Sequence, residues 1–422
     1  MNASGLKKFI IFFLGAVLVL FIFTSLLSFP NEAFYMSLPV CWLIFQVIYH
    51  PRFLRRWFTL RTVVKGVAGY LCVLAYFGYI SAVMGWRIIF REVFLSAYFL
   101  LSVGIVIHWV RLVVRLIAQR ARGMVKTRKW KMVAYGATFL ILWGLTILPF
   151  IVATFTIHRP KIGNQIDPLS GYGLPYQDVA LRAKDGVIVH AWFVPMQGSD
   201  KGVVIGHGLG ANKSNFLPLV KLWHDLDYNV LIFDFRGHGQ SQGHTLTFGL
   251  REKYDIIAAV DYLSGLSEID PQKIVGYGVS FGAAAVIHAA AEDTRIRAVV
   301  VDSSFADVDV MARKVVDSLF FVPPFLRGLI ADVSLGFVNL EIGCDIRAAS
   351  PMGVIRRIEN RPVYIIHGVQ DKLVPFEEAL TLYALANAPK QHYWIDTPGH
   401  YATLADSFYA QRINNFLNDH GV

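Results

Sequence analysis

The stretch GYGVSFG contains one serine, Ser280, whose flanking residues are those of a Gly-x-Ser-x-Gly pattern with Gly278 and Gly282 at its ends. Two residues further along the chain could assist this serine: Asp371 in GVQDKLVP and His400 in TPGH. A serine becomes a nucleophile when a histidine accepts its proton and a carboxylate orients that histidine. The order Ser280, Asp371, His400 therefore predicts acyl transfer by a nucleophile, an acid and a base.

Each of these residues comes soon after a stretch typical of a β-strand. Eight strands are predicted, in the stretches DVALRA, VIVHAWF, GVVIGH, NVLIFDF, KIVGYG, RAVVVD, PVYIIHG and HYWID. The central ones are continuous β-branched runs of the kind buried on both faces, and helical patterns separate them from about residue 214 onward. We expect an α/β fold: a mostly parallel, doubly wound eight-stranded sheet that begins with an antiparallel pair. Ligands of such sheets bind at the carboxyl ends of the strands.

Helix signals and one long interval complete this domain, which we place at residues 176–422. Ser214 is predicted to cap the helix in NFLPLVKLWHDL, and Gly265 to follow the helix in EKYDIIAAVDYLSGL. The interval 303–361 interrupts the alternation of strands and helices and is rich in apolar residues, so it predicts a helical cap over the sheet. Residues 158–175 form the predicted linker.

An oxyanion formed during acyl transfer needs backbone donors, one after the nucleophile and one after the third strand. The residues at these positions are Phe281 and, in HGLGANKSN, Leu209. His207 and Gly208 are expected to shape the loop that carries Leu209.

Two other polar positions need a role. Asp302 directly follows RAVVV and is the alternative acid, although we favour Asp371. In DFRGHGQSQG, Asp234, Arg236 and Ser241 are expected to hold the loop through hydrogen bonds, because none of them duplicates a role of the triad.

These stretches, in this order, resemble the α/β-hydrolase superfamily, in particular its branch of serine aminopeptidase-like and monoacylglycerol-lipase-like enzymes. The resemblance covers about residues 185–400 and implies a serine hydrolase that needs no cofactor. The three cysteines, Cys41, Cys72 and Cys344, fit neither a disulfide framework nor a zinc site, so no metal is expected.

The first 157 residues are mostly apolar and predict an all-α transmembrane region. The resemblance to the superfamily does not extend to this region. Five apolar runs approach the ~20 residues of a bilayer-spanning helix; they cover residues 9–29, 34–49, 66–86, 93–110 and 133–155. Residues 1–160 hold 18 Lys and Arg against 2 Asp and Glu, whereas residues 161–422 hold 22 against 28. The basic residues lie between apolar runs and the folded domain is acidic, which excludes a nucleic-acid partner.

The basic loops predict the orientation of the spans. Fifteen Lys and Arg fall on alternate loops, beginning with Lys7 and Lys8, and only Arg87 and Arg91 fall on the other set. Loops rich in Lys and Arg stay in the cytoplasm, so five spans with a cytoplasmic amino terminus place the hydrolase domain outside the cytoplasm. If the second run, which contains Pro39, is re-entrant, the domain lies on the other side.

The sequence thus predicts a membrane-anchored serine hydrolase that cleaves ester or thioester bonds of a lipid or a small acylated molecule. The apolar cap stretches LFFVPPFL and LIADVSLGFVNL suit an acyl chain, a contact with the bilayer or simple packing within the cap. The alternatives are a serine peptidase and a membrane scaffold with an inactive domain. The oligomeric state is not predicted.

Overall fold

The computed structural model describes residues 145, 148–320, 322–400 and 406–422. Contacts divide the chain into two compact units, Met1–Leu140 and Ile141–Val422, and the residues described here belong to the second. Within them, no helix combines the length and apolar character required to cross a membrane. The four predicted spans at 9–29, 34–49, 66–86 and 93–110, and most of the fifth at 133–155, lie outside the described residues.

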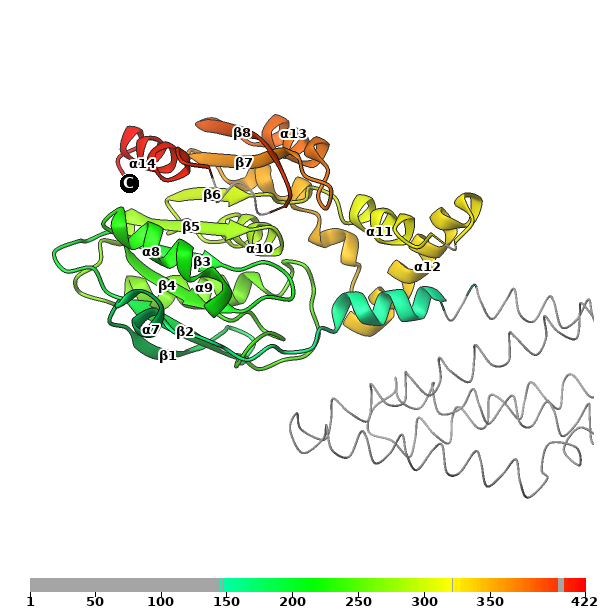
Figure 1. Ribbon diagram of the computed structural model, residues 1–422, viewed down its shortest axis with the longest axis horizontal. Coiled ribbons are helices and arrows are strands. Elements are labelled where there is room, and N and C mark those ends of the chain that lie inside the picture. The colour runs from blue at the N-terminus through cyan, green and yellow to red at the C-terminus, as the bar shows by residue number, and fades with distance from the viewer. Residues whose placement is uncertain (1–144, 146–147, 321, 401–405) are drawn as a thin grey trace, which may run out of the picture. The chain divides into compact units, whose positions relative to one another are not determined.

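Eight strands form one sheet in the order β1-β2-β4-β3-β5-β6-β7-β8 (Figure 1). Their bounds are β1 Gln177–Arg182, β2 Ile188–Val194, β3 Gly202–Gly206, β4 Asn229–Phe233, β5 Ile274–Val279, β6 Ala298–Asp302, β7 Val363–Gln370 and β8 Lys390–Pro398. Strand β2 is antiparallel to both of its neighbours, and the pairs from β4 to β8 are all parallel. The predicted mostly parallel eight-stranded sheet is confirmed, with the addition that β2 is also antiparallel to β4.

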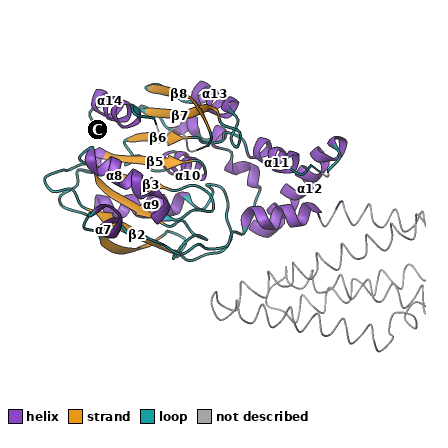
Figure 2. Cartoon of the chain, viewed as in Figure 1, coloured by secondary structure: helices purple, strands orange, loops and turns teal. Residues whose placement is uncertain are grey.

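Helices cover both faces of the sheet (Figure 2). On one face α9 (Lys253–Ser264), α10 (Phe281–Ala290) and α13 (Phe376–Leu385) bury their apolar sides. On the other face lie α8 (Leu217–Asp225) and α14 (Tyr409–Asp419). The central strands β3, β4, β5 and β6 are buried at every residue, because each carries apolar side chains toward both helical layers.

One predicted helix start is wrong. A 3-10 helix, η1 (Lys213–Phe216), precedes α8, and its N-cap is Asn212 rather than Ser214. The Asn212 side chain accepts hydrogen bonds from the backbone N–H groups of Ser214 and Asn215, as N-cap residues commonly do. Gly265 follows α9 as its C-cap, as predicted.

The predicted cap segment contains two longer helices, α11 (Val308–Asp317) and α12 (Pro324–Ile342), which extend beyond one end of the strands in Figure 1. The short turns η3 (Ile346–Ala349), η4 (Pro351–Gly353) and η5 (Ile355–Arg357) lead back to β7, and η2 (Pro271–Lys273) precedes β5.

The segment before the sheet is also structured. Residues 148–157 are helical, and we call them the leading helix. The predicted linker contains α7 (Pro168–Tyr172), which Asp167 caps and Pro168 begins. The leading helix and the linker thus pack within the same compact unit as the sheet.

Candidate active site

Ser280 lies in the sharp turn between β5 and α10. Its backbone has φ 55° and ψ −114°, a region that a residue with a side chain rarely adopts. The turn is possible because the flanking positions are glycines. A Cβ at Gly278 would lie 2.5 Å from the Gly282 carbonyl, and one at Gly282 would lie 2.3 Å from the Gly206 oxygen. This local geometry is that of a nucleophile elbow, in which a strained turn presents the serine at the top of the sheet.

His400 and Asp371 form a hydrogen-bonded pair. The Nδ1 atom of His400 donates to Oδ2 of Asp371 at 2.6 Å, which leaves Nε2 as the basic nitrogen of the ring. The other carboxylate oxygen accepts the backbone N–H groups of Leu373 and Val374 at 2.8 and 3.0 Å. Burial alone would raise the pKa of Asp371, but these hydrogen bonds and the attraction of His400 hold it below its usual value.

The end of β6 links the serine turn to the histidine. The Ser280 N–H donates to the Asp302 carbonyl at 2.8 Å, and the Ser303 hydroxyl oxygen lies 3.1 Å from the His400 carbonyl oxygen. Strands β5, β6, β7 and β8 are consecutive parallel neighbours. Their carboxyl ends therefore bring Ser280, Asp371 and His400 to one edge of the sheet.

Asp302, the alternative acid, lies at the same edge but has other partners. Its carboxylate accepts the Ser303 hydroxyl at 2.8 Å and the Tyr409 hydroxyl at 2.7 Å. Tyr409 in turn shares a hydrogen bond with Tyr277. These buried contacts tie α14 to the sheet, whereas the Asp371 carboxylate carries the hydrogen bond to His400 Nδ1.

The two predicted oxyanion donors lie beside the serine turn. Phe281 is the first residue of α10, and the first N–H groups of a helix have no acceptor within it. Leu209 lies in the turn after β3, and the next residue is already engaged, since the Gly210 N–H donates to His238 Nε2 at 3.1 Å. This arrangement favours the Leu209 N–H over that of Gly210 as the second donor.

His207 lies beneath this turn and is fully buried. Its Nδ1 donates to the Gly208 carbonyl at 2.8 Å, and its Nε2 accepts the Phe235 N–H at 3.0 Å. Burial lowers its pKa, so the ring is neutral and both nitrogens serve the backbone. The geometry fits the loop-shaping role expected for His207.

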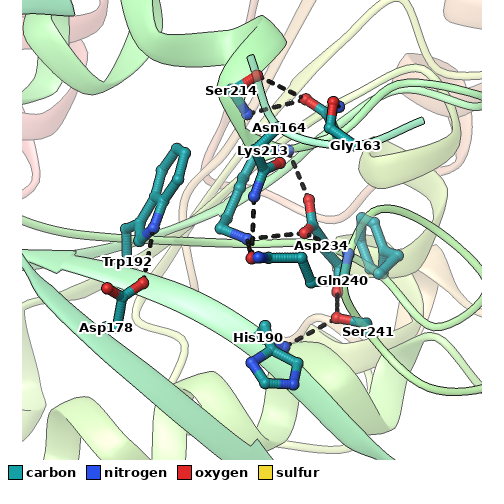
Figure 3. Close-up of polar contacts among 12 residues, drawn as sticks. Gly163, Asn164, Asp178, His190, Trp192, Lys213, Ser214, Asp234, Gln240 and Ser241 are labelled. Atoms are coloured by element: carbon teal, nitrogen blue, oxygen red, sulfur yellow. Dashed lines mark hydrogen bonds and ion pairs between the residues drawn. The ribbon is translucent and has the colours of Figure 1, made fainter. Parts of the chain in front are cut away.

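A buried lysine, which sequence reasoning missed, joins the turn after β3 to the loop after β4. Lys213 and Asp234 have no exposed side-chain surface, and Nζ donates to the Asp234 carboxylate at 2.7 Å. Figure 3 shows Lys213 pointing to both Asp234 and Gln240, with a bond of 2.9 Å to Gln240. The Trp192 ring lies 4.6 Å from Nζ, a cation–π distance. Burial raises the pKa of Asp234, but the charge of Lys213 reverses this and leaves it lowered.

The predicted linker binds to the same network. The Asn212 side chain donates to the carbonyls of Ile162 and Gly163 at 3.0 and 3.1 Å. Asn164 donates to Gln240 at 3.0 Å, and the Lys161 amine donates to the Ser241 carbonyl. The linker therefore holds the loops that follow β3 and β4.

Arg236 and Ser241 join the loop after β4 to neighbouring segments. Arg236 is buried and pairs with the carboxylates of Asp255 and Asp185. Ser241 donates to the Asp234 carbonyl at 2.5 Å and accepts the His190 N–H at 2.8 Å, contacts that Figure 3 shows.

Sequence reasoning also missed two further buried residues. His367, in YIIHG, is buried 3.7 Å from the Asp371 carboxylate and donates from Nε2 to the Val374 carbonyl. Glu378 accepts the N–H groups of Ala306 and Asp307 and so fixes the start of the cap segment. Nothing in their sequence context distinguishes them from ordinary strand and helix residues. Among the described residues, no group of three His, Cys, Asp or Glu side chains could hold a metal.

Comparisons with known proteins agree with this architecture. Residues 202–343 match the family described as alpha/beta hydrolase fold. The chain is 27% identical to protein YfhR of Escherichia coli O157:H7 over 66% of this chain and 92% of that protein. It is 30% identical to the alpha/beta hydrolase domain-containing protein WAV2 of Arabidopsis thaliana over 51% of this chain and 68% of that protein.

Among solved structures, the chain is similar to the esterase Pf2001 of Pyrococcus furiosus, with 25% identity and a TM-score of 0.54. The likeness covers 62% of this chain and 97% of the esterase. The fold, the elbow and these relatives together show that the chain belongs to the α/β-hydrolase superfamily and contains a hydrolase fold with esterase-like structural neighbours.

Proposed function

We propose that this protein is a serine hydrolase that cleaves ester or thioester bonds through an acyl-enzyme intermediate. The observation that carries the proposal is the 2.6 Å hydrogen bond between His400 and Asp371 at the sheet edge where the strained turn presents Ser280. The similarity to a Pyrococcus furiosus esterase supports ester chemistry.

In the proposed mechanism, His400 Nε2 takes the proton of the Ser280 hydroxyl as its oxygen attacks the carbonyl carbon. The Phe281 and Leu209 N–H groups stabilise the oxyanion, and the proton then passes from His400 to the leaving group. Water hydrolyses the acyl-enzyme by the same path in reverse. Asp371 keeps Nδ1 protonated throughout and stabilises the imidazolium.

The hydrolase is further proposed to be anchored by five spans within residues 1–157, with its catalytic domain outside the cytoplasm. The alternating distribution of Lys and Arg supports this orientation. A reporter fused after Val422, active only outside the cytoplasm, tests it, and activity of a cytoplasmic reporter would contradict it.

The chemistry is tested with the purified full-length protein. We expect hydrolysis of p-nitrophenyl esters and acyl thioesters that Ser280→Ala abolishes, and much slower cleavage of aminoacyl p-nitroanilides. Preferential cleavage of the anilides would instead indicate a peptidase. Inertness toward all of these substrates would indicate a binding domain.

A further inference from the structure

The cap helix α12 carries an exposed apolar stripe. Phe325, Leu329 and Leu340 are 83%, 48% and 81% exposed, and helical spacing places Val333 and Gly336 between them on the same side. The opposite side of α12 is buried, at Ile330, Ala331, Ser334, Leu335, Val338 and Ile342. A surface helix with two apolar sides needs a partner for the second one.

The buried side of α12 packs along the leading helix in parallel order. Leu148 and Val152 pack against the cluster of Val322, Ile330 and Ala331. Further along, Ala153 and Ile157 lie in the cluster that contains Leu335, Val338 and Ile342. The ring of Phe150 meets that of Phe337 edge to face at 5.2 Å. The start of α12 is therefore beside the start of the leading helix.

The leading helix continues an apolar stretch of the sequence. The leading helix contains the end of the fifth apolar run, residues 133–155, which is long enough to span a bilayer. Phe325 lies five residues before Ile330, about 7 Å further along the α12 axis toward the first residues of the leading helix. If the run spans, the start of α12 lies on the bilayer side of the run's last residue, 155.

We propose that the amino-terminal half of α12 inserts into the surface of the lipid bilayer, with Phe325 and Leu329 among the acyl chains. Two basic side chains border this half: Arg327 donates to the Val322 carbonyl, and a Cβ at Gly328 would lie 3.0 Å from the Arg313 guanidinium. Long basic side chains beside an apolar stripe suit phosphate headgroups. Their carboxylate partners, Asp317 and Asp332, are at least half exposed.

The inserted helix belongs to the segment that follows Asp302, at the sheet edge of Ser280. This inference rests on the proposed hydrolase function and deepens it, because a cap in contact with lipid directs the serine to esters that reside in that leaflet. The substrate class is thus a membrane lipid ester rather than a freely soluble ester.

The first experiment measures lipid contact and does not depend on activity. In full-length protein with Cys41, Cys72 and Cys344 replaced by serine, single cysteines at Phe325, Leu329, Leu340 and Gln272 are labelled with an environment-sensitive fluorophore. The protein is reconstituted in phosphatidylcholine vesicles that contain a lipid with a nitroxide near the top of its acyl chain. Gln272, in the exposed turn before β5, is the control.

We expect the quenching to decrease from Phe325 to Leu329 to Leu340, with Gln272 close to zero. Equal quenching at Phe325 and Gln272 overturns the proposal. A second result also overturns the proposal: the nitroxide lipid does not quench the Phe325 label, but the label's fluorescence changes when the protein is diluted in the membrane. The stripe would then bind a second copy of the chain.

The second experiment separates this proposal from the proposed chemistry. Phe325→Asp should slow hydrolysis of a lipid ester in vesicles about tenfold, the factor expected when one large apolar side chain no longer inserts, without changing the rate on a soluble p-nitrophenyl ester. The matched control is Leu380→Asp on α13, where Leu380 is 44% exposed, and it should change neither rate. Equal loss on both esters overturns lipid docking. Absence of any Ser280-dependent hydrolysis in the unsubstituted protein contradicts the chemistry instead.

Discussion

Replacement of Lys213 by methionine tests the buried network that joins the turn after β3 to the loop after β4. The substitution keeps an unbranched apolar stem of similar volume, one atom shorter, but removes the positive charge that lies over the Trp192 ring. The Asp234 carboxylate, which has no exposed surface, then keeps two donors, the backbone N–H groups of residue 213 and Gln240 at 2.8 and 3.0 Å.

The expected loss of stability follows from the number of donors that Asp234 keeps. Removing one partner of a buried ion pair costs about 3 to 5 kcal/mol because a buried charge is left uncompensated. Since two backbone donors to Asp234 remain, we expect the free energy of unfolding to fall by the lower end of this range, about 3 kcal/mol. For a domain of this size class, each kcal/mol lowers Tm by about 2 to 4 °C, so Lys213→Met should unfold about 6 to 12 °C below the unsubstituted protein.

The assay is thermal unfolding of the full-length protein in nanodiscs, followed by tryptophan fluorescence at one scan rate. The double variant Lys213→Met/Asp234→Asn should recover at least half of the loss, because the buried charge is gone. The matched control is Lys221→Met, since the Lys221 pair with Asp225 is largely exposed and should shift Tm by less than about 2 °C. A shift this small for Lys213→Met, or additive losses in the double variant, would refute the reasoning.

Three further predictions follow from the site. Asp371→Asn should lower kcat about 10⁴-fold because His400 loses its orientation, whereas Asp302→Asn should keep kcat within about tenfold; the reverse result, in kinetics on a p-nitrophenyl ester, would make Asp302 the acid. Burial lowers the pKa of His238 from 6.5 to about 3, so the unfolded chain binds a proton that the folded protein does not. The stability present above pH 6.5 is then lost as the pH falls toward 3, by about 2 kcal/mol at pH 5, and urea titrations should show a smaller loss in His238→Gln. Finally, Gly282→Ala should prevent stable folding, at a cost of about 3 kcal/mol or more, because its Cβ would lie 2.3 Å from the Gly206 oxygen; Gly163→Ala, where nothing lies within 4 Å, should have little effect in the same denaturation assay.

The fold could be predicted because its signals are local. Each strand of the parallel sheet is a short apolar run, as in NVLIF of β4, and its burial on both faces requires that composition. The Gly-x-Ser-x-Gly turn could be recognised because a close backbone approach leaves no space for side chains at Gly278 and Gly282.

Other features could not be predicted because they depend on contacts between distant segments. Lys213 is a surface residue by its type, and only its position opposite Asp234 and Gln240 explains its burial. Ser214 and Asn212 are both suitable N-cap residues, and the chain uses Asn212 because its amide also reaches the carbonyls of the linker at 162 and 163. The packing of α12 on the leading helix likewise joins segments about 180 residues apart.

The central claim is that Ser280 is the nucleophile, and covalent labelling tests it most directly. The full-length protein is treated with a fluorophosphonate probe and the modified peptide is identified by mass spectrometry. We predict one adduct, on the Ser280 hydroxyl, that disappears in Ser280→Ala and is greatly slowed in His400→Ala. Labelling that persists in Ser280→Ala, or an adduct on another residue, would contradict the account.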